Sequence, residues 1–250
     1  MDIVTGAMVI AGLKYVGQPS AELVKDFIGR ILAPPADAIG AIAAHPIVEW
    51  QKRRVERGEQ VVEHASVLVQ QAGKEPKAVP GRLLLSILEH SSVEEEPDLS
   101  RAWVALLANA SISPTHVLPA FPKLLSELSP LEARLLQYLY DIHVSENRTR
   151  SLFPNHLHDE RRLDTDKQQL EKLREARGDR EIRYRLGIDS SDIYNVITEN
   201  VERMSLIRRT PDYGDAPEKY EGHSWGISLT TLGQAFVKAC RPPLNRREAK

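Results

Sequence analysis

The histidines are the side chains in this sequence whose type could hold a metal ion. His156 and His158 lie two residues apart in the run His156-Leu157-His158-Asp159. This spacing places both rings on one side of a strand but on different faces of a helix. No cysteine lies nearby, and the other histidines are scattered without the spacing of a zinc site. We therefore expect solvent-exposed loop histidines, with no metal site and no cofactor.

Catalytic sequence patterns are missing. The chain has no glycine-rich phosphate loop, no Gly-x-Ser-x-Gly turn and no His-Glu-x-x-His pair. The acids Glu94 to Glu96 lie in a charged turn, and Cys240 is the single cysteine. A lone thiol forms no internal disulfide, and we expect Cys240 to be a small buried residue. The sequence predicts no catalytic residue and no enzyme. It does not exclude a nuclease, whose carboxylates can come from separate parts of the chain.

A helix over residues 190–204, followed by Arg208 and Arg209, could contact a partner. Its apolar spacing predicts a buried face made by Ile193, Val196, Ile197, Val201 and Met204. The residues that we expect to be available for an interaction or a nucleic-acid contact are Tyr194, Asn195, Arg203, Arg208 and Arg209. Phosphate contacts need Lys or Arg, but the exposed side of this helix has three acids against one base. DNA binding is therefore less favoured here than a protein contact or a structural role.

The elements around this helix have the order of a winged helix. Residues 206–210 and 224–229 are predicted strands, and a turn-rich loop joins them. Thr230 is placed to begin a last helix that contains Gly233. In a winged helix, the helix before such a hairpin enters the major groove and the loop between the strands is the wing. The sequence therefore predicts a winged-helix-like module with a short β-hairpin.

Helical periodicity dominates the remainder, so we predict a mainly α fold. Residues 1–128 are expected to form a multi-helix domain, and residues 129–241 the winged-helix-like domain. The capping pattern Ser129-Pro130-Leu131-Glu132 marks the first helix of that second domain. A charged helical insertion is expected at about 145–187, and residues 242–250 are expected to be a disordered tail.

Two apolar segments, Met8–Val16 and Ala38–Val48, could pack in a core or lie on a membrane surface. Both are shorter than the roughly 18–20 residues needed to cross a bilayer, and little positive charge accompanies them.

The formal net charge of −2 excludes a global field that gathers nucleic acid. With no secretory signal and one cysteine, we expect a cytoplasmic protein.

The run Pro97-Asp98-Leu99-Ser100-Arg101-Ala102-Trp103-Val104-Ala105-Leu106-Leu107-Ala108-Asn109-Ala110 resembles the central signature of the abortive infection alpha (Abi-alpha) family. The segments Leu128-Ser129-Pro130-Leu131-Glu132-Ala133 and Leu229-Thr230 with Gly233, Phe236 and Cys240 are also similar to that family. The resemblance extends over most of residues 1–240 and is weakest over 145–187.

This resemblance implies a bacterial helical protein of phage defence, and it carries over no catalytic residue. Trp103, Leu106 and Leu107 are expected in the core, and a buried Asn109 must find hydrogen-bond partners, as in a tie to a neighbouring backbone. The hypothesis that follows is a non-enzymatic defence protein that acts through a protein partner or self-association. A DNA-binding regulator and a membrane-active effector remain as alternatives.

Overall fold

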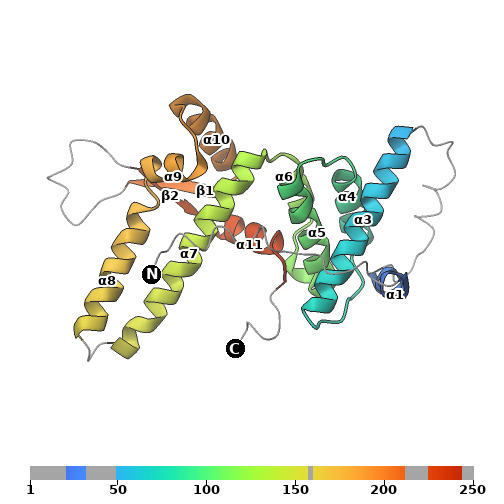
Figure 1. Cartoon of the computed structure of the whole chain (residues 1–250), viewed down its shortest axis with the longest axis horizontal. Coiled ribbons are helices and arrows are strands. Elements are labelled where there is room, and N and C mark those ends of the chain that lie inside the picture. The colour runs from blue at the N-terminus through green and yellow to red at the C-terminus, as the bar shows by residue number, and fades with distance from the viewer. Residues whose placement is uncertain (1–20, 32–48, 157–159, 212–224, 244–250) are drawn as a thin grey trace. The chain divides into compact units, whose positions relative to one another are not determined.

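The computed structural model describes residues 21–31, 49–156, 160–211 and 225–243. The chain divides into two compact units. Of the described residues, those from 21 to 130 and from 238 to 243 belong to the N-terminal unit, and those from 131 to 237 belong to the C-terminal unit. The described elements are mainly α-helices with one small antiparallel sheet, as the sequence predicts (Figure 1). Several sequence predictions fall outside the described residues: the apolar segments 8–16 and 38–48, His158, most of the loop between the strands, and the tail from residue 244.

The helices of the N-terminal unit are α1 (Ala21–Ile31), α3 (Glu49–Gln71), α4 (Gly81–Ser91), α5 (Pro97–Ile112) and α6 (Phe121–Ser126), with a 3-10 turn η4 (Pro114–His116). Helix α5 packs against α3, α4 and α6, which makes it the central element of this unit. The residue that precedes it is Glu96, and Asp98 lies in its first turn. The helix starts at Pro97 because proline fits the first helical turn, where its missing N–H leaves no hydrogen bond unmade.

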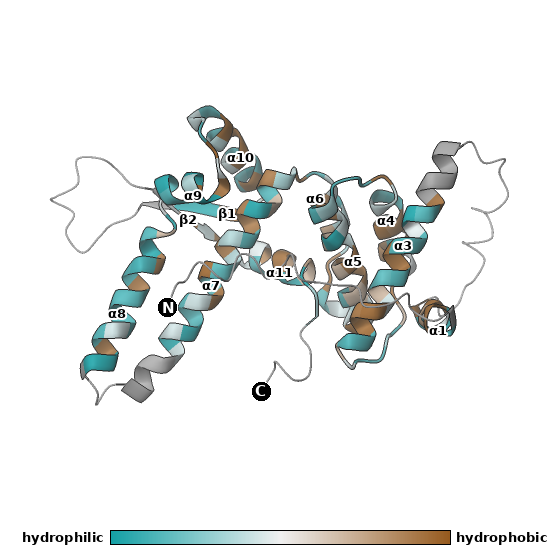
Figure 2. Ribbon diagram, in the orientation of Figure 1, coloured by the Kyte–Doolittle hydropathy of each residue, from teal (hydrophilic) through white to brown (hydrophobic). Residues whose placement is uncertain are grey.

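The C-terminal unit contains α7 (Pro130–His156), α8 (Glu160–Glu175), α9 (Asp179–Leu186), α10 (Ser191–Arg203), β1 (Ile207–Pro211), β2 (Trp225–Leu229) and most of α11 (Thr231–Ala239). The charged stretch is helical: α7 extends into it, and α8 is hydrophilic along most of its length (Figure 2). Helix α9 was not expected from the sequence. Only Ile182 and Leu186 of α9 are buried, which is too short an apolar pattern to indicate a helix.

The β-hairpin follows α10, close to the predicted positions. Strand β1 pairs antiparallel with β2, with Ile207 opposite Leu229 at one end and Pro211 opposite Trp225 at the other. A single bridge between Gly178 and Gly226 joins the start of α9 to β2. The hairpin therefore lies beside both α9 and α10, which also contact it. The assignment of these elements to a winged helix stays a prediction.

A tight turn holds α10, β1 and α11 together. Ser205 has a φ of 59°, a left-handed conformation that reverses the chain between α10 and β1. The Thr230 hydroxyl donates to the Ser205 carbonyl over 2.6 Å and accepts from the Gly233 N–H over 2.9 Å. A Cβ atom at Gly233 would lie 2.0 Å from the Leu206 carbonyl oxygen. The Leu-Thr step and the glycine noted in the sequence are therefore what allows α11 to begin against this turn.

Candidate functional site

Helix α10 begins at a point that several local interactions define. Gly187 ends α9 in the left-handed conformation, with a φ of 67°. The Arg183 guanidinium then donates to the carbonyls of Ile188 and Asp189 in the connecting segment. Ser190 caps α10 by accepting from the Ile193 N–H over 3.4 Å. This cap agrees with the start at residue 190 that the sequence predicts for this helix.

Tyr194 lies on the inner face of α10. Its ring is buried, and its hydroxyl donates to Asp179 Oδ1 of α9 over 2.8 Å. Burial and, secondarily, the hydrogen bond to Asp179 raise the pKa of Tyr194. The expectation that Tyr194 faces solvent is wrong, because the buried stripe runs through Tyr194, Ile197 and Val201. Tyr194 therefore holds α10 against α9 and offers no surface for a partner.

The predicted cationic residues have different environments. Arg209 Nη2 donates to the buried Thr198 hydroxyl over 2.6 Å, and Arg209 Nε lies 3.4 Å from Glu202 Oε2. Its charge is thus directed back at α10. Arg208 is exposed and donates from Nε to Ser228 Oγ of β2 over 3.3 Å. The two neighbouring arginines therefore do not form one cationic patch, because adjacent strand residues point to opposite faces.

The outward face of α10, hereafter the α10 face, comprises Asp192, Ile193, Asn195, Val196, Glu199 and Arg203, all of which are exposed. Arg203 donates to Asn200 Oδ1 over 2.8 Å. Ile193 and Val196 are 52% and 65% exposed. The sequence analysis predicted that both are buried. This is wrong, because the side of α10 that faces the protein interior is the one that carries Tyr194, Ile197 and Val201. The signal that the sequence analysis missed is the position of the acids Asp192 and Glu199 beside this apolar pair, which indicates a solvent-facing side of the helix.

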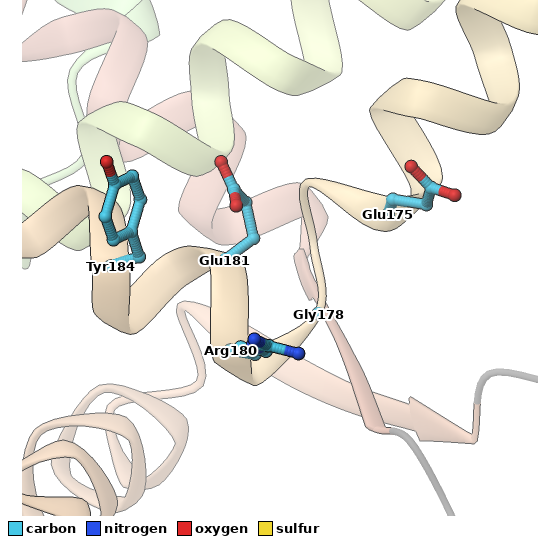
Figure 3. Close-up of a pocket in the computed structure, with 5 residues that line it drawn as sticks. All are labelled: Glu175, Gly178, Arg180, Glu181 and Tyr184. Atoms are coloured by element: carbon cyan, nitrogen blue, oxygen red, sulfur yellow. The ribbon is translucent and has the colours of Figure 1, made fainter.

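A pocket of about 670 Å³ lies where α8 gives way to α9. Its lining residues are Glu175, Gly178, Arg180, Glu181 and Tyr184 (Figure 3). Figure 3 shows Tyr184 and Glu181 pointing to the same side of α9. Glu181 accepts from Arg185 Nε over 2.7 Å, and this hydrogen bond raises the pKa of Arg185. The pocket can bind polar groups, but no nucleophile and general base come together in it.

A second pocket of about 410 Å³ lies in the N-terminal unit, between α3 and the turn from α4 to α5. Its lining residues are Arg57, Gln60, Val61, His64, Ser91, Glu94, Glu95, Pro97 and Ser100. Arg57 Nη2 pairs with Glu95 Oε1 over 2.9 Å. Burial lowers the pKa of His64, with Glu63 opposing this shift, so the ring is neutral at pH 7. The described residues contain no cluster of three or more His, Cys, Asp or Glu suited to a metal ion.

The signature residues of α5 form the core of the N-terminal unit. Trp103, Leu106 and Leu107 are fully buried, and the His90 ring stacks on Trp103 with 6.1 Å between ring centroids. Asn109 Nδ2 donates to the carbonyls of Ala105, Ala239 and Arg241 over 3.0, 2.9 and 2.7 Å. The amide thus fastens the chain beyond α11 to α5. These residues contact other protein groups and do not converge on a ligand cavity.

Comparison with known protein families decides where the chain belongs. Residues 48–240 match the family described as Abortive infection alpha, which is more than half of the sequence. The chain belongs to the abortive infection alpha family. No curated protein and no solved structure matches it.

Membership in the family implies a role in abortive infection, a defence against phage. The match contains the α5 signature, α10 and the hairpin, but it starts at Val48 and so leaves out most of the apolar segments that resembled the family in layout. Among the described residues, no helix has both the length and the apolar character needed to cross a membrane. The α10 face is exposed and lies within the matched region.

Proposed function

We propose that this member of the abortive infection alpha family acts in phage defence by binding another protein through the α10 face. The proposal includes no catalytic step and no contact with DNA. The observation that carries it is the charge of this face. Asp192 and Glu199 form no hydrogen bond or ion pair within the described structure, whereas the nearby cations are engaged with α10 or β2.

Electrostatics argue against a duplex as the partner. A DNA-binding helix needs Lys or Arg side chains that reach phosphates and displace counterions. Here Arg209 is directed inward, Arg203 is bonded to Asn200, and the free carboxylates would face the phosphate backbone. A major groove would therefore repel the helix that the winged-helix interpretation assigns to it.

The order of elements supports a winged-helix-like interaction module. The order of elements in that architecture is matched by α9, α10, β1, β2 and α11. The bridge between Gly178 and Gly226 adds a short third segment that pairs with β2 of the hairpin. Winged helices use the helix before the hairpin as their reading element. We assign α10 the same exposed position with a protein as partner.

The site chemistry supports a non-enzymatic mechanism in the cytoplasm. Burial raises the pKa of the Cys240 thiol, which disfavours the reactive thiolate at neutral pH. A single cysteine suits a reducing compartment.

Phage infection of cells that express the chain tests the proposal. We expect reduced plaque formation against at least one phage of a broad panel, relative to an empty vector. The variant Arg208→Ala should protect as well as the natural sequence, because Arg208 lies outside the α10 face and a protein that binds no DNA does not need this cation.

Titration of labelled duplex DNA at low salt completes the test. We expect no binding whose affinity falls with rising salt. Salt-dependent binding, together with loss of protection in Arg208→Ala, would identify a DNA-binding regulator instead. Unchanged plaquing across the whole panel would reject the defence role itself.

A further inference from the structure

The α10 face has an apolar centre. Ile193 and Val196 are three residues apart, so their side chains are neighbours on the helix surface. Each exposes more than half of its surface, although Tyr194 and Ile197 beside them are buried. Isolated exposed aliphatic residues are ordinary, but an adjacent pair on a regular helix forms a continuous patch.

Free carboxylates flank this apolar centre. Asp192 and Glu199 lie four residues before and three residues after Val196, so both are on the same side of α10 as Val196. No partner for either carboxylate exists in the described parts of the chain. The cation nearest to them along the helix, Arg203, donates to Asn200. The α10 face therefore combines an apolar centre with net negative charge.

This combination restricts the chemistry of an occupant. Apolar side chains are needed to cover Ile193 and Val196, and cations are needed opposite Asp192 and Glu199 so that their potentials are complementary. An acidic partner would place like charges together, and DNA would do the same. A helix that carries apolar residues along one side, with Lys or Arg at its borders, meets both requirements.

We infer that the α10 face binds a basic amphipathic segment of a partner protein. The apolar side of the segment lies on Ile193 and Val196, and its Lys or Arg side chains pair with Asp192 and Glu199. This inference rests on the proposed function and adds the chemistry of the partner. It also separates the roles of the residues: the aliphatic pair supplies area, and the acids supply specificity and speed of association.

Photo-crosslinking in infected cells tests the inference directly. Asn195 lies between Ile193 and Val196 in the chain and is exposed, so a photo-reactive phenylalanine there samples the α10 face in the full-length protein. Mass spectrometry then identifies the crosslinked segment. We expect a segment of another protein with several Lys or Arg residues bordering apolar ones.

Variants of the acids and of the aliphatic pair show how the crosslink yield and the protection depend on each part of the α10 face. Asp192→Lys/Glu199→Lys should lower the crosslink yield and the protection by roughly tenfold or more, because like charges then face each other. Ile193→Ser/Val196→Ser should lower both to a similar extent. Circular dichroism and urea unfolding should remain unchanged in both variants, since the four side chains are exposed.

Matched controls separate a local effect from a general one. Glu56→Lys/Glu171→Lys makes the same change in net charge at exposed sites on α3 and α8. Leu85→Ser/Val144→Ser removes two aliphatic side chains that are 54% and 46% exposed. Both controls should keep the yield and the protection of the natural sequence.

Several results would overturn the inference. They are a crosslinked segment that is acidic, a crosslink to DNA, a crosslink to a second copy of this chain, or a variant with the photo-reactive residue at position 195 that protects cells without forming any crosslink. In each case protection by the natural sequence would leave the proposed defence role intact, while absence of protection would reject the proposed function first.

Discussion

Helices α5 and α10 differ in how they use their surfaces. Most of α5 is buried, including Trp103 and the two residues Leu106 and Leu107, and its neighbours contact it from several directions. In α10 one stripe, Tyr194 with Ile197 and Val201, is buried and the opposite face is open. The family signature therefore lies on a helix that organises a core, while the face available to a partner lies elsewhere. A recurring motif in a family can report packing and still not be the site of action.

Removal of a large side chain should show this difference most strongly. Trp103→Ala leaves a cavity in the N-terminal unit and should lower the free energy of unfolding by about 4 kcal/mol. Ile193→Ala, which shortens an exposed side chain on α10, should change it by less than about 0.5 kcal/mol. Urea unfolding followed by circular dichroism measures both. Similar losses in the two variants would contradict the contrast between the helices.

The support beneath α10 should be the next most sensitive point. Gly233→Ala places a methyl group against the Leu206 carbonyl, and we expect a loss of about 3 kcal/mol because backbone cannot move aside without breaking the turn. Gly58→Ala is the matched control, since a Cβ there meets nothing within 4 Å and glycine weakens a helix. The control should gain about 0.5–1 kcal/mol. Thermal unfolding of both variants provides the measurement.

A smaller loss is expected for the amide that fastens the end of α11 to α5. Asn109→Ala removes the donor to the carbonyls of Ala239 and Arg241 and should cost about 1–3 kcal/mol. Amide hydrogen exchange should also become faster around residues 239–243. Asn195→Ala, at an exposed amide on α10, should change neither quantity. Equal exchange in the two variants would show that the contact does not hold this segment.

The smallest effect concerns pH. The folded pKa of His64 lies below its unfolded value of 6.5, so the unfolded chain binds the proton first as pH falls. The contribution of His64 to stability is therefore present above pH 6.5 and is lost as pH decreases through the folded pKa. His64→Gln should flatten this part of the stability curve. A curve between pH 7 and pH 5 that matches the natural protein would refute the assignment.

Local signals in the sequence predicted much of the secondary structure. The helix starts at Ser190 and Thr230 depend on side chains within a few residues of each other, and the structure has both at those places. Helix α9 was missed because charged residues form most of it and only two of its side chains are buried. The buried side of α10 was also predicted wrongly. A periodicity argument treats every apolar residue as buried, and Ile193 and Val196 are apolar although no neighbour covers them.

The partners of some carboxylates could not be predicted from the sequence either, because these partners are distant along the chain. The capping pattern in the sequence pairs Glu132 with Ser129, and in the structure the Glu132 carboxylate accepts from Asn200 Nδ2 of α10 over 2.6 Å. Glu146 likewise pairs with Arg177 over 2.7 Å, across 31 positions of the chain. Such partners come together only when separate helices pack, so spacing along the chain carries no sign of them.

The sequence by itself determined the helical composition, the starts of α10 and α11, the hairpin and the family, because each of these depends on residue types at short separations. Only the tertiary structure decided that Tyr194 and Arg209 turn inward while Ile193, Val196, Asp192 and Glu199 face solvent. The physical reason is that burial depends on which neighbour covers a side chain. For α10 those neighbours are α9 and β1, which the sequence places before and after the helix but not on one particular side of it.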